Sequence, residues 1–209
     1  MSEVQILLPV QNDLIELINL NTNYFAKAEQ SNKALKIPDE MYRNYAEHIT
    51  KKALTLEQIL FAKQNNEIIG FLIWEDYCKP LVEGIKANPE VYKLIEPELA
   101  FVELLEKELN VRYQFSEKEC AKLLQAGVLP EFHNKGIATA LAGKAISNIK
   151  EKGYKYAIAD CTADNSWKVL FKLGFEILIE ISYSDFEFQG VNTYAELEGK
   201  SRLVFRQLL

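Results

Sequence analysis

The sequence is poor in the residues that usually hold a metal or a disulfide framework. Its 209 residues include three cysteines and two histidines. Cys78, Cys120 and Cys161 lie far apart, and no Cys-x-x-Cys pair occurs. This spacing predicts reduced thiols and no metal site, because a structural zinc site needs clustered ligands.

The sequence also lacks a long apolar run and an excess of basic residues. No stretch approaches the ~20 apolar residues of a membrane span, and no basic leader precedes an apolar stretch near Met1. The 24 Lys and Arg residues against 30 Asp and Glu give a formal net charge of −6, whereas nucleic-acid binders usually present a basic face. We expect a cytoplasmic protein with no membrane or nucleic-acid partner. A cationic small molecule is compatible with the charge.

What the chain does have is enough apolar sequence for one core. Hydrophobic residues make up 48% of it and aromatic residues 11%. No repeat, low-complexity tract or Gly/Ser linker divides it, so we expect a single α/β domain over residues 1–209. Apolar residues recur at steps of three and four from Ile95 to Leu109, which predicts a helix within an insertion at about 79–118.

Apolar periodicity and turn residues predict the order of the elements. Strands are expected at residues 4–8, 58–63, 68–74, 120–129, 156–162, 175–184 and 203–209. Helices are expected at residues 12–25, 38–53, 136–152 and 166–173, besides the helix of the insertion. Strands and helices alternate in the second half of the chain, which favours a sheet flanked by helices.

The most informative stretch runs from Leu124 to Ala140. A strand that stops at Pro130, passes through a short polar loop and enters a helix at Gly136 directs unpaired backbone N–H groups at one spot. These donors and the positive helix end suit a pyrophosphate, and the small residues Gly136 and Ala138 leave room for it. An ordinary strand-to-helix turn has the same general pattern, so the chemistry alone leaves both interpretations open.

This stretch resembles the motif V-x-P-x-x-[RQ]-x-x-G-x-[GA] of the GNAT superfamily of N-acetyltransferases. The matching residues are Val128, Pro130, Gly136 and Ala138. His133 stands where the family usually has arginine or glutamine. Downstream, the segment from Ser166 to Phe175 resembles the short helix and K-x-G-F ending that GNAT proteins place beside the pantetheine arm. Two matches in the right order strengthen the resemblance.

The resemblance implies a GNAT fold and acetyl-CoA as the cofactor. The fold would be one domain with a central, mixed and mostly antiparallel sheet of about seven strands, flanked by helices, with the helical insertion before the phosphate-motif strand. That strand splays from its neighbour in the family, so its backbone would bind pantetheine. The cofactor-binding residues implied are Gly127, Val128, Leu129, His133, Asn134, Lys135, Gly136, Ile137, Ala138, Thr139, Asn165 and Ser166.

Proton transfer needs residues outside this motif. Many GNAT enzymes protonate the departing thiolate with a tyrosine of the short helix, but Leu170 stands there and cannot donate. An alkylamine, with a pKa near ~10.4, also needs a base. The segment 23–30 resembles the F-x-x-x-E-P segment of insect arylalkylamine (dopamine) N-acetyltransferases. This implies Glu29 as general base, with the hydroxyls of Thr162 and Ser166 taking part; a solvated helix-end carboxylate is the alternative for Glu29.

Other candidates have ordinary structural explanations. Cys161 is expected to be a small core residue rather than a nucleophile, and His48 a partly exposed helical residue rather than an acid or base. Aromatic residues of the insertion and the late strands could wall an amine pocket, although such residues more often form core. They are Tyr92, Phe101, Tyr113, Phe115, Tyr183, Phe186, Phe188 and Tyr194.

We therefore expect an enzyme that transfers an acetyl group from acetyl-CoA to a primary amine of a small molecule, by direct attack in a ternary complex. Two alternatives remain open. One is acetylation of a protein or peptide amine, and the other is a non-catalytic acyl-CoA-binding module, which Leu170 and Ala163 would suit. The sequence does not determine the identity of the amine or the oligomeric state, for which a homodimer is one option.

Overall fold

The computed structural model describes residues 3–87 and 89–209. One sheet of seven strands runs in the order β1-β2-β3-β4-β5-β7-β6. The strands are β1 (Gln5–Leu7), β2 (Ile59–Gln64), β3 (Glu67–Asp76), β4 (Cys120–Val128), β5 (Tyr156–Cys161), β6 (Glu176–Ser182) and β7 (Lys200–Gln207). The α-helices are α1 (Leu14–Leu20), α2 (Ala26–Ala28), α3 (Gln30–Leu35), α4 (Asp39–Thr55), α5 (Pro89–Arg112), α6 (Ile137–Glu151) and α7 (Asp164–Phe171).

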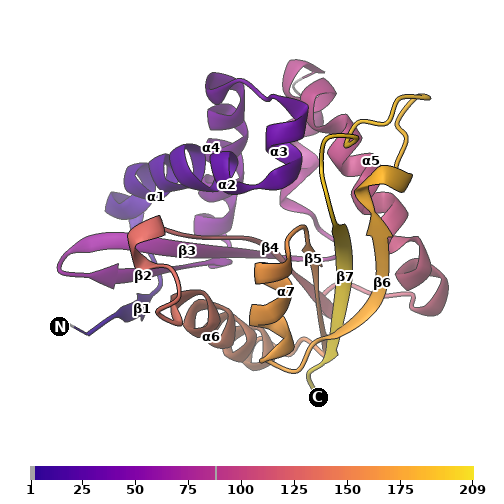
Figure 1. Cartoon of the computed structure of the whole chain (residues 1–209). Coiled ribbons are helices and arrows are strands. Elements are labelled where there is room, and N and C mark those ends of the chain that lie inside the picture. The colour runs from indigo at the N-terminus through magenta and orange to yellow at the C-terminus, as the bar shows by residue number, and fades with distance from the viewer. Residues whose placement is uncertain (1–2, 88) are drawn as a thin grey trace.

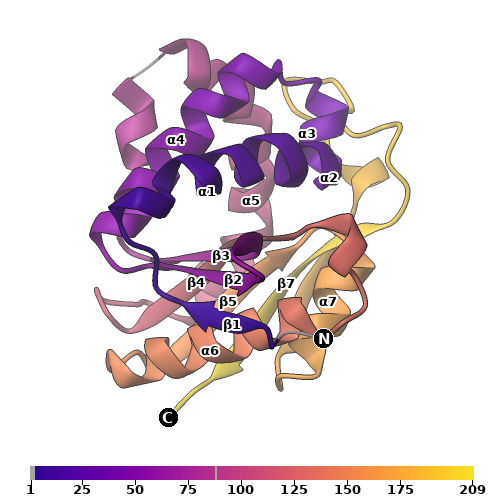
Figure 2. The ribbon, with the colours of Figure 1, turned by 90° about the vertical axis from the view of Figure 1, so that its left-hand side faces the viewer.

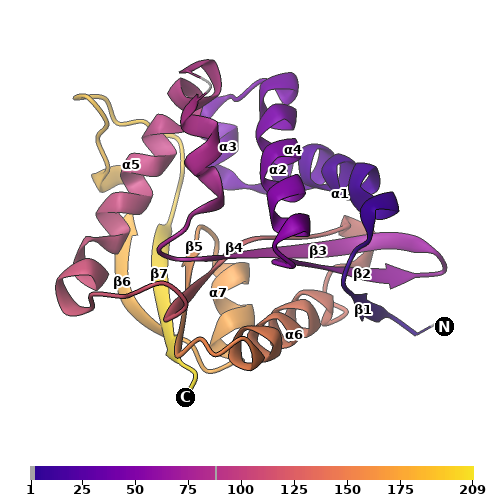
Figure 3. The same cartoon turned by 180° about the vertical axis from the view of Figure 1, so that it is seen from behind.

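The molecule has three layers, with the sheet in the middle (Figure 1). Helices α1 to α5 cover one face and helices α6 and α7 the other, as the side view in Figure 2 shows. Seen from behind, α5 lies over the end of the sheet that carries β7 and β6 (Figure 3). Among the described residues, no helix combines the length and apolar character needed to cross a bilayer.

The helices of both layers follow from their apolar stripes. In α6, buried residues recur every four positions from Ile137 through Leu141 and Ala145 to Ile149, so one face of the helix packs on the sheet. In α5, Phe101, Leu105 and Leu109 recur at the same spacing and pack against residues of β5 and β7. Each stripe meets the apolar face of the sheet, and together they bury both sides.

The predicted fold class is confirmed: an α/β sheet of seven strands, mixed because only the β4–β5 pair is parallel among the described strands, and flanked by helices. The strands expected at residues 58–63 and 68–74 pair with each other as a hairpin. Its two turn residues, Asn65 and Asn66, have φ values of 51° and 67°. Asparagine tolerates this left-handed conformation better than most residues, which suits the tight turn of a hairpin.

Several predicted boundaries are shifted. The first helix is expected from residue 12, where Asn12 would cap it, but a 3-10 turn (Gln11–Asp13) precedes α1 and the carboxylate of Asp13 accepts from the N–H of Val10 at 2.8 Å. The first helical segment continues beyond α1 through a π-helical turn (Asn21–Phe25) to α2. Helix α7 begins at Asp164, ahead of the predicted start at residue 166, and β7 begins at Lys200 instead of residue 203.

Strand β4 parts from β5 halfway along its length. Their parallel pairing runs from Cys120 opposite Tyr156 to Leu123 opposite Ala159, whereas β4 itself continues to Val128. On the other side of β4, Leu123 pairs with Trp74 and Gln125 with Ile73, so Leu124 is the extra residue of a β-bulge. A bulge bends and twists its strand. The bend opens the sheet between β4 and β5.

A ring of buried amide and hydroxyl groups holds the bent part of β4. Asn21 donates to the side-chain carbonyl of Gln125 at 3.0 Å, Gln125 donates to the hydroxyl of Tyr42 at 3.1 Å, and Tyr42 donates back to Asn21 at 3.2 Å. All three side chains are buried. The ring therefore joins the π-helical turn, α4 and β4 just beyond the bulge.

Two glycines of the α6 region should respond in opposite ways to alanine. Gly136 has a φ of 79° and nothing lies within 4 Å of an added Cβ, so Gly136→Ala should cost about 1 kcal/mol from backbone strain alone. Gly143 lies inside α6, where an added Cβ would contact Leu173 at 3.9 Å. Gly143→Ala should stabilise the fold by about 0.5–1 kcal/mol. Urea unfolding of both variants measures the difference, and effects of equal sign would contradict this account.

Candidate active site

A cavity of about 820 Å³ lies at the opening between β4 and β5. Residues of α3, α4 and α5 line one part of it, and residues of the loop before α6, of α6 itself and of α7 line the other. These two groups of helices cover opposite faces of the sheet (Figure 2). The cavity therefore crosses the sheet, and two molecules could enter it from opposite faces and meet at the opening.

The predicted phosphate loop forms one end of this cavity. After β4, Pro130–Phe132 makes a 3-10 turn, and Gly136 starts α6 in the left-handed conformation. The N-terminal N–H groups of α6 therefore face the cavity end, as an anion site requires. The predicted cofactor-binding residues that line the cavity are Val128, His133, Asn134, Gly136, Ile137, Ala138, Thr139, Asn165 and Ser166.

The other predicted cofactor-binding residues, Gly127, Leu129 and Lys135, are not among the described lining residues. Leu129 is buried in the core. The ammonium of Lys135 lies 4.7 Å from the ring centre of Phe132, in a cation–π contact. An added Cβ on Gly127 would stand 2.9 Å from the ring of Phe71. Glycine is therefore needed at this position for β4 to pack against β3. This packing requirement is independent of any role of the Gly127 backbone in binding the cofactor.

His133 makes a contact that the motif does not suggest. Its ring nitrogen Nε2 lies 2.8 Å from the carbonyl oxygen of Val128, so a protonated Nε2 donates to the last residue of β4. The side chain is exposed and also lines the cavity. His133 thus links the phosphate loop to the end of β4. Arginine or glutamine, the usual residues of the family at this position, could make such a link through a different donor group.

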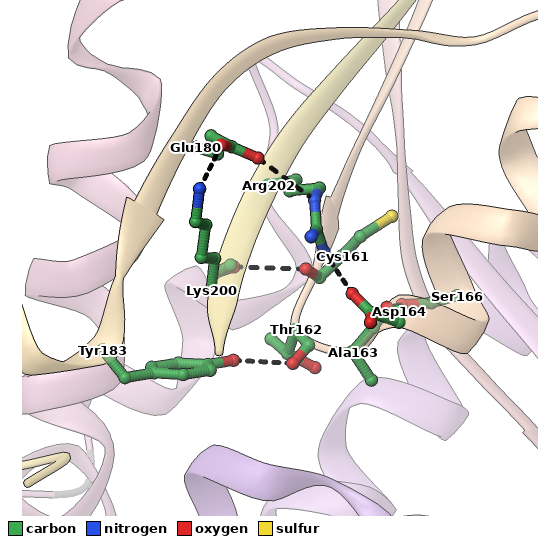
Figure 4. A network of polar contacts seen from close by, with 10 residues as sticks. Cys161, Thr162, Ala163, Asp164, Ser166, Glu180, Tyr183, Lys200 and Arg202 are labelled. Carbon is green, nitrogen blue, oxygen red and sulfur yellow. Dashed lines mark hydrogen bonds and ion pairs between the residues drawn. The ribbon is translucent and has the colours of Figure 1, made fainter. Parts of the chain in front are cut away.

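Helix α7 is held in place by an ion-pair network at its first turn (Figure 4). Arg202 of β7 donates to Asp164 at 2.8 Å and pairs with Glu180 of β6 at 3.3 Å. The hydroxyl of Tyr183 donates to the backbone carbonyl of Thr162 at 2.7 Å. These contacts position the segment that links β5 to α7, where Thr162 and Ser166 line the cavity.

The two residues that bear on alternative mechanisms lie on either side of this link, Cys161 in β5 and Leu170 in α7. Leu170 is buried and lines the cavity, so an apolar side chain faces the place where the family tyrosine would stand. Cys161 also lines the cavity, but burial raises the pKa of its thiol to about 12. A thiol with that pKa is a poor nucleophile near neutral pH. The structure thus supports the interpretation of Cys161 as a core residue.

Glu29 stands at the break between α2 and α3, and its two carboxylate oxygens have different surroundings. Its Oε2 accepts from the hydroxyl of Ser31 at 2.5 Å and from the backbone N–H of Asn32 at 2.7 Å. Glu29 therefore caps the N-terminus of α3. Its Oε1 is buried without a hydrogen-bond partner among the described residues, and the side chain lines the cavity.

Glu29 is also close to the opening in the sheet. The backbone N–H of Glu29 donates to the carbonyl of Phe25, one turn earlier, at 2.9 Å. Phe25 packs edge-on against Phe71 of β3, and its Cβ would lie 3.6 Å from a Cβ added to Gly127 of β4. The backbone of Glu29 is therefore one helical turn from Phe25, which lies beside the bent part of β4.

Glu98 of α5 is a second carboxylate beside Glu29. Its Oε2 accepts from the hydroxyl of the buried Tyr194 at 2.7 Å. Burial, together with the negative charge of Glu29, raises the pKa of Glu98 to about 7. Glu98 falls on the polar side of a helical stripe, where a charge is the ordinary expectation, so the sequence does not single it out.

A group of buried charges that the sequence motifs do not predict forms the floor of the cavity. The ammonium of Lys122 on β4 lies 2.5 Å from Glu106 of α5 and 2.5 Å from Asp160 of β5. Glu75 of β3 is buried beside them and accepts from the N–H of Leu81 at 2.6 Å. A signal was present, since Lys122 and Asp160 are the charged residues in two predicted strands that are mostly apolar.

The aromatic residues proposed as pocket walls lie elsewhere. Phe101 is buried against Tyr183, Phe186 and Tyr194. The rings of Tyr113 and Phe115 are stacked, and both pack on Tyr156 of β5. The aromatic residues that do line the cavity are Phe25, Tyr42, Tyr45, Tyr77 and Phe132.

His48 lies on α4 and is not among the lining residues of the cavity. The Nε2 atom of His48 lies 3.2 Å from the carbonyl oxygen of Leu81, away from the cavity lining. This agrees with a structural role on α4. Within residues 3–87 and 89–209, no group of three or more His, Cys, Asp or Glu side chains has a geometry suited to a metal ion.

Comparison with known proteins identifies the class to which this architecture belongs. The sequence profile of the acetyltransferase (GNAT) family matches residues 23–175. The chain therefore belongs to the GNAT family of acetyltransferases, and the resemblance seen in the two sequence motifs is confirmed. A comparison with curated proteins gives no match.

Solved structures share the fold over its whole length. Arylalkylamine N-acetyltransferase 2 from Aedes aegypti has a TM-score of 0.80 and 18% identity, covering 100% of both chains. Drosophila melanogaster polyamine N-acetyltransferase, which forms N-acetylagmatine, has a TM-score of 0.80 and 15% identity, covering 99% of this chain and 100% of its own. The C-terminal condensation domain of Ebony, in complex with beta-alanyl-dopamine, has a TM-score of 0.84 and 13% identity over 99% and 100%. At these identities the likeness shows the fold alone.

Replacing Glu75 by glutamine should change the pH dependence of stability. Burial raises the pKa of Glu75 from 4.5 to about 7, so its protonated form is favoured in the folded state. The stability it contributes is fully present below pH 4.5 and is lost as the pH rises through about 7. At about 1.4 kcal/mol per pH unit, the loss is about 3 kcal/mol. Glu75→Gln keeps the shape and the acceptor for Leu81 but cannot ionise.

Denaturant unfolding at pH 5 and pH 8 tests this expectation. Glu75→Gln should match the wild type at the lower pH and exceed its stability at the higher one. Glu103→Gln, an exposed change on α5, is the matched control and should leave the two curves parallel. An equal effect of Glu75→Gln at both pH values would show that Glu75 does not titrate as described.

Proposed function

We propose that this protein transfers an acetyl group from acetyl-CoA to a primary amine of a small molecule, with Glu29 as general base. The observation that carries the proposal is the polarity of the cavity that crosses the sheet. Its end on the α6 and α7 side has helix N–H groups and the basic side chains of Lys168 and Lys172. Its end on the α3 to α5 side is lined by carboxylates. An anionic cofactor and a cationic amine would enter from opposite sides.

The residues at the first end fit acetyl-CoA. The N-terminus of α6 and the loop residues from His133 to Gly136 would hold the pyrophosphate, because backbone N–H groups converge there. The part of β4 beyond Leu123 is free of β5 and could offer its backbone to the pantetheine arm. Acetyl-CoA would supply the activated acyl group, and this chain would orient it at the opening of the sheet.

The reaction requires two proton transfers. The ammonium of the substrate first loses a proton to Oε1 of Glu29, which frees the nitrogen lone pair. The nitrogen then bonds to the acyl carbon and the carbon–sulfur bond breaks. The second proton of the nitrogen ends on the departing sulfur, and Glu29 returns its proton to solvent. Two contacts fix Oε2 of Glu29, so Oε1 can accept without the side chain having to reorient.

Because Leu170 cannot donate a proton, the thiolate needs another source. Thr162 and Ser166 line the cavity on the side of α7, and the hydroxyl of Ser166 already donates to the carbonyl of Ala163 at 2.7 Å. We assign these two hydroxyls to positioning the acyl group and to relaying the second proton. Their position agrees with this role, since both follow the last paired residues of β5.

Glu29→Gln should lower turnover by about 10²–10⁴-fold, the range typical of a lost general base. The affinity for CoA should be unchanged, because Glu29 lies on the other side of the opening from the phosphate loop. Thiol release from acetyl-CoA with a panel of primary amines gives turnover, and calorimetry with CoA gives affinity. Near-normal turnover of Glu29→Gln would rule out the base role.

The matched control is Glu16→Gln. Like Glu29, Glu16 accepts a backbone N–H, that of Ile68 at 3.1 Å, but it does not line the cavity. The control should therefore lose at most a little stability and no turnover. If the wild type binds CoA but turns over none of the amines, the binding-module hypothesis replaces the proposed function.

A further inference from the structure

The amine end of the cavity holds more negative charge than its own residues neutralise. The carboxylates that line this end are Glu29, Glu75, Glu98, Glu106 and Asp160. Among the described residues that line it, the cation on this side is Lys122, whereas Lys168 lies on α7 and Lys172 directly follows that helix. Burying a carboxylate without a partner is costly. A single ammonium cannot balance this set.

Lys122 is already committed to two of these carboxylates. Its ammonium lies 2.5 Å from one oxygen each of Glu106 and Asp160. The side chains of all three are nearly buried, with exposed fractions of 9%, 13% and 10% for Lys122, Glu106 and Asp160. The other oxygen of Asp160, Oδ1, is buried without a hydrogen-bond partner, although the residue lines the cavity.

Of the three carboxylates in the cavity floor, Glu75, Glu106 and Asp160, Glu75 is the one without an ion-pair partner in the described part of the chain. Its side chain is 5% exposed and one of its oxygens accepts from the N–H of Leu81. The charges of Glu106 and Asp160 oppose its ionisation, while Lys122 favours it. A second cation placed between Glu75 and Oδ1 of Asp160 would satisfy both groups at once.

We propose that the cavity floor formed by Glu75, Glu106, Asp160 and Lys122 is a subsite for a second positive charge of the substrate. The acceptor is then a dicationic amine: one primary amine reacts beside Glu29, and an ammonium or guanidinium group at the other end binds Glu75 and Asp160. This inference rests on the proposed function and names the substrate class of the same site.

Glu75 is the specificity-determining residue within this subsite. Glu106 and Asp160 would be needed to hold Lys122 even without a substrate, because removal of either leaves a buried charge with fewer partners. Glu75 adds a charge that Lys122 does not bind. Removing that charge therefore leaves the ion pairs of the cluster in place and takes away one contact to the distal cation.

Matched substrates test the subsite. Putrescine and agmatine carry a distal ammonium and a distal guanidinium, and n-butylamine has the same reacting amine without a second charge. The wild type should show a kcat/KM for putrescine or agmatine at least about tenfold above that for n-butylamine, since a charged hydrogen bond contributes about a factor of ten to a hundred. Assays are run above the pKa of Glu75, which burial raises to about 7.

Glu75→Gln should lower kcat/KM for the two dications by about tenfold to a hundredfold, mostly through KM, and should change that for n-butylamine by less than about twofold. Glu103→Gln, exposed on α5, should change neither. If wild type and Glu75→Gln treat the dications and n-butylamine alike, the cluster is purely structural and the subsite is wrong, while the proposed function stands.

A binding measurement keeps the two proposals separate. Calorimetry with the CoA-loaded protein measures the affinities for putrescine and n-butylamine without turnover. If no amine is acetylated, the proposed function fails, and the subsite is then judged by binding alone. Tighter binding of putrescine that is lost in Glu75→Gln supports the subsite, and equal binding of both amines overturns it.

Discussion

The parting of β4 from β5 is the constraint on which the rest of this structure depends. One extra residue, Leu124, bends β4 away after the pair Leu123–Ala159. The bend removes a stretch of the ladder from the middle of the sheet, and hydrogen bonds to a neighbouring strand are normally what stabilise a central strand. The buried ring of Asn21, Tyr42 and Gln125 compensates in part by tying the bent segment to the helices above it.

The same opening explains why charged side chains are buried in the sheet. Lys122 and Asp160 lie next to the last paired residues of β4 and β5, so their side chains reach the cavity rather than a closed core. The buried position makes each charge costly alone, and Glu106 of α5 completes the pairing from above. The insertion before β4 therefore covers the sheet and also contributes to the cavity, because it supplies Glu98 and Glu106 to the cavity lining.

The parts of this architecture that the sequence predicted are the local ones. The strand, loop and helix around Gly136 are consecutive, and their turn chemistry can be read directly. The cavity floor could not be found in the same way, since Glu75, Glu106 and Asp160 come from β3, α5 and β5. Their meeting is a property of the tertiary fold, and likewise no local residue preference marks the bulge at Leu124. The first residues of α7 and β7, Asp164 and Lys200, also form ion pairs with residues distant in sequence, which local patterns do not reveal.

Glu29 shows why a structural and a chemical role need not be alternatives. The chain leaves the helical conformation at this residue, whose ψ is 130°, and a new helix needs a cap there. The capping contacts use one oxygen and hold the other at the cavity wall, so the interaction that stabilises α3 also orients the proposed base. A side chain that is held by hydrogen bonds to neighbouring residues of its own segment keeps its geometry when substrates enter and leave. The break between α2 and α3 and the opening between β4 and β5 therefore both shape the same cavity.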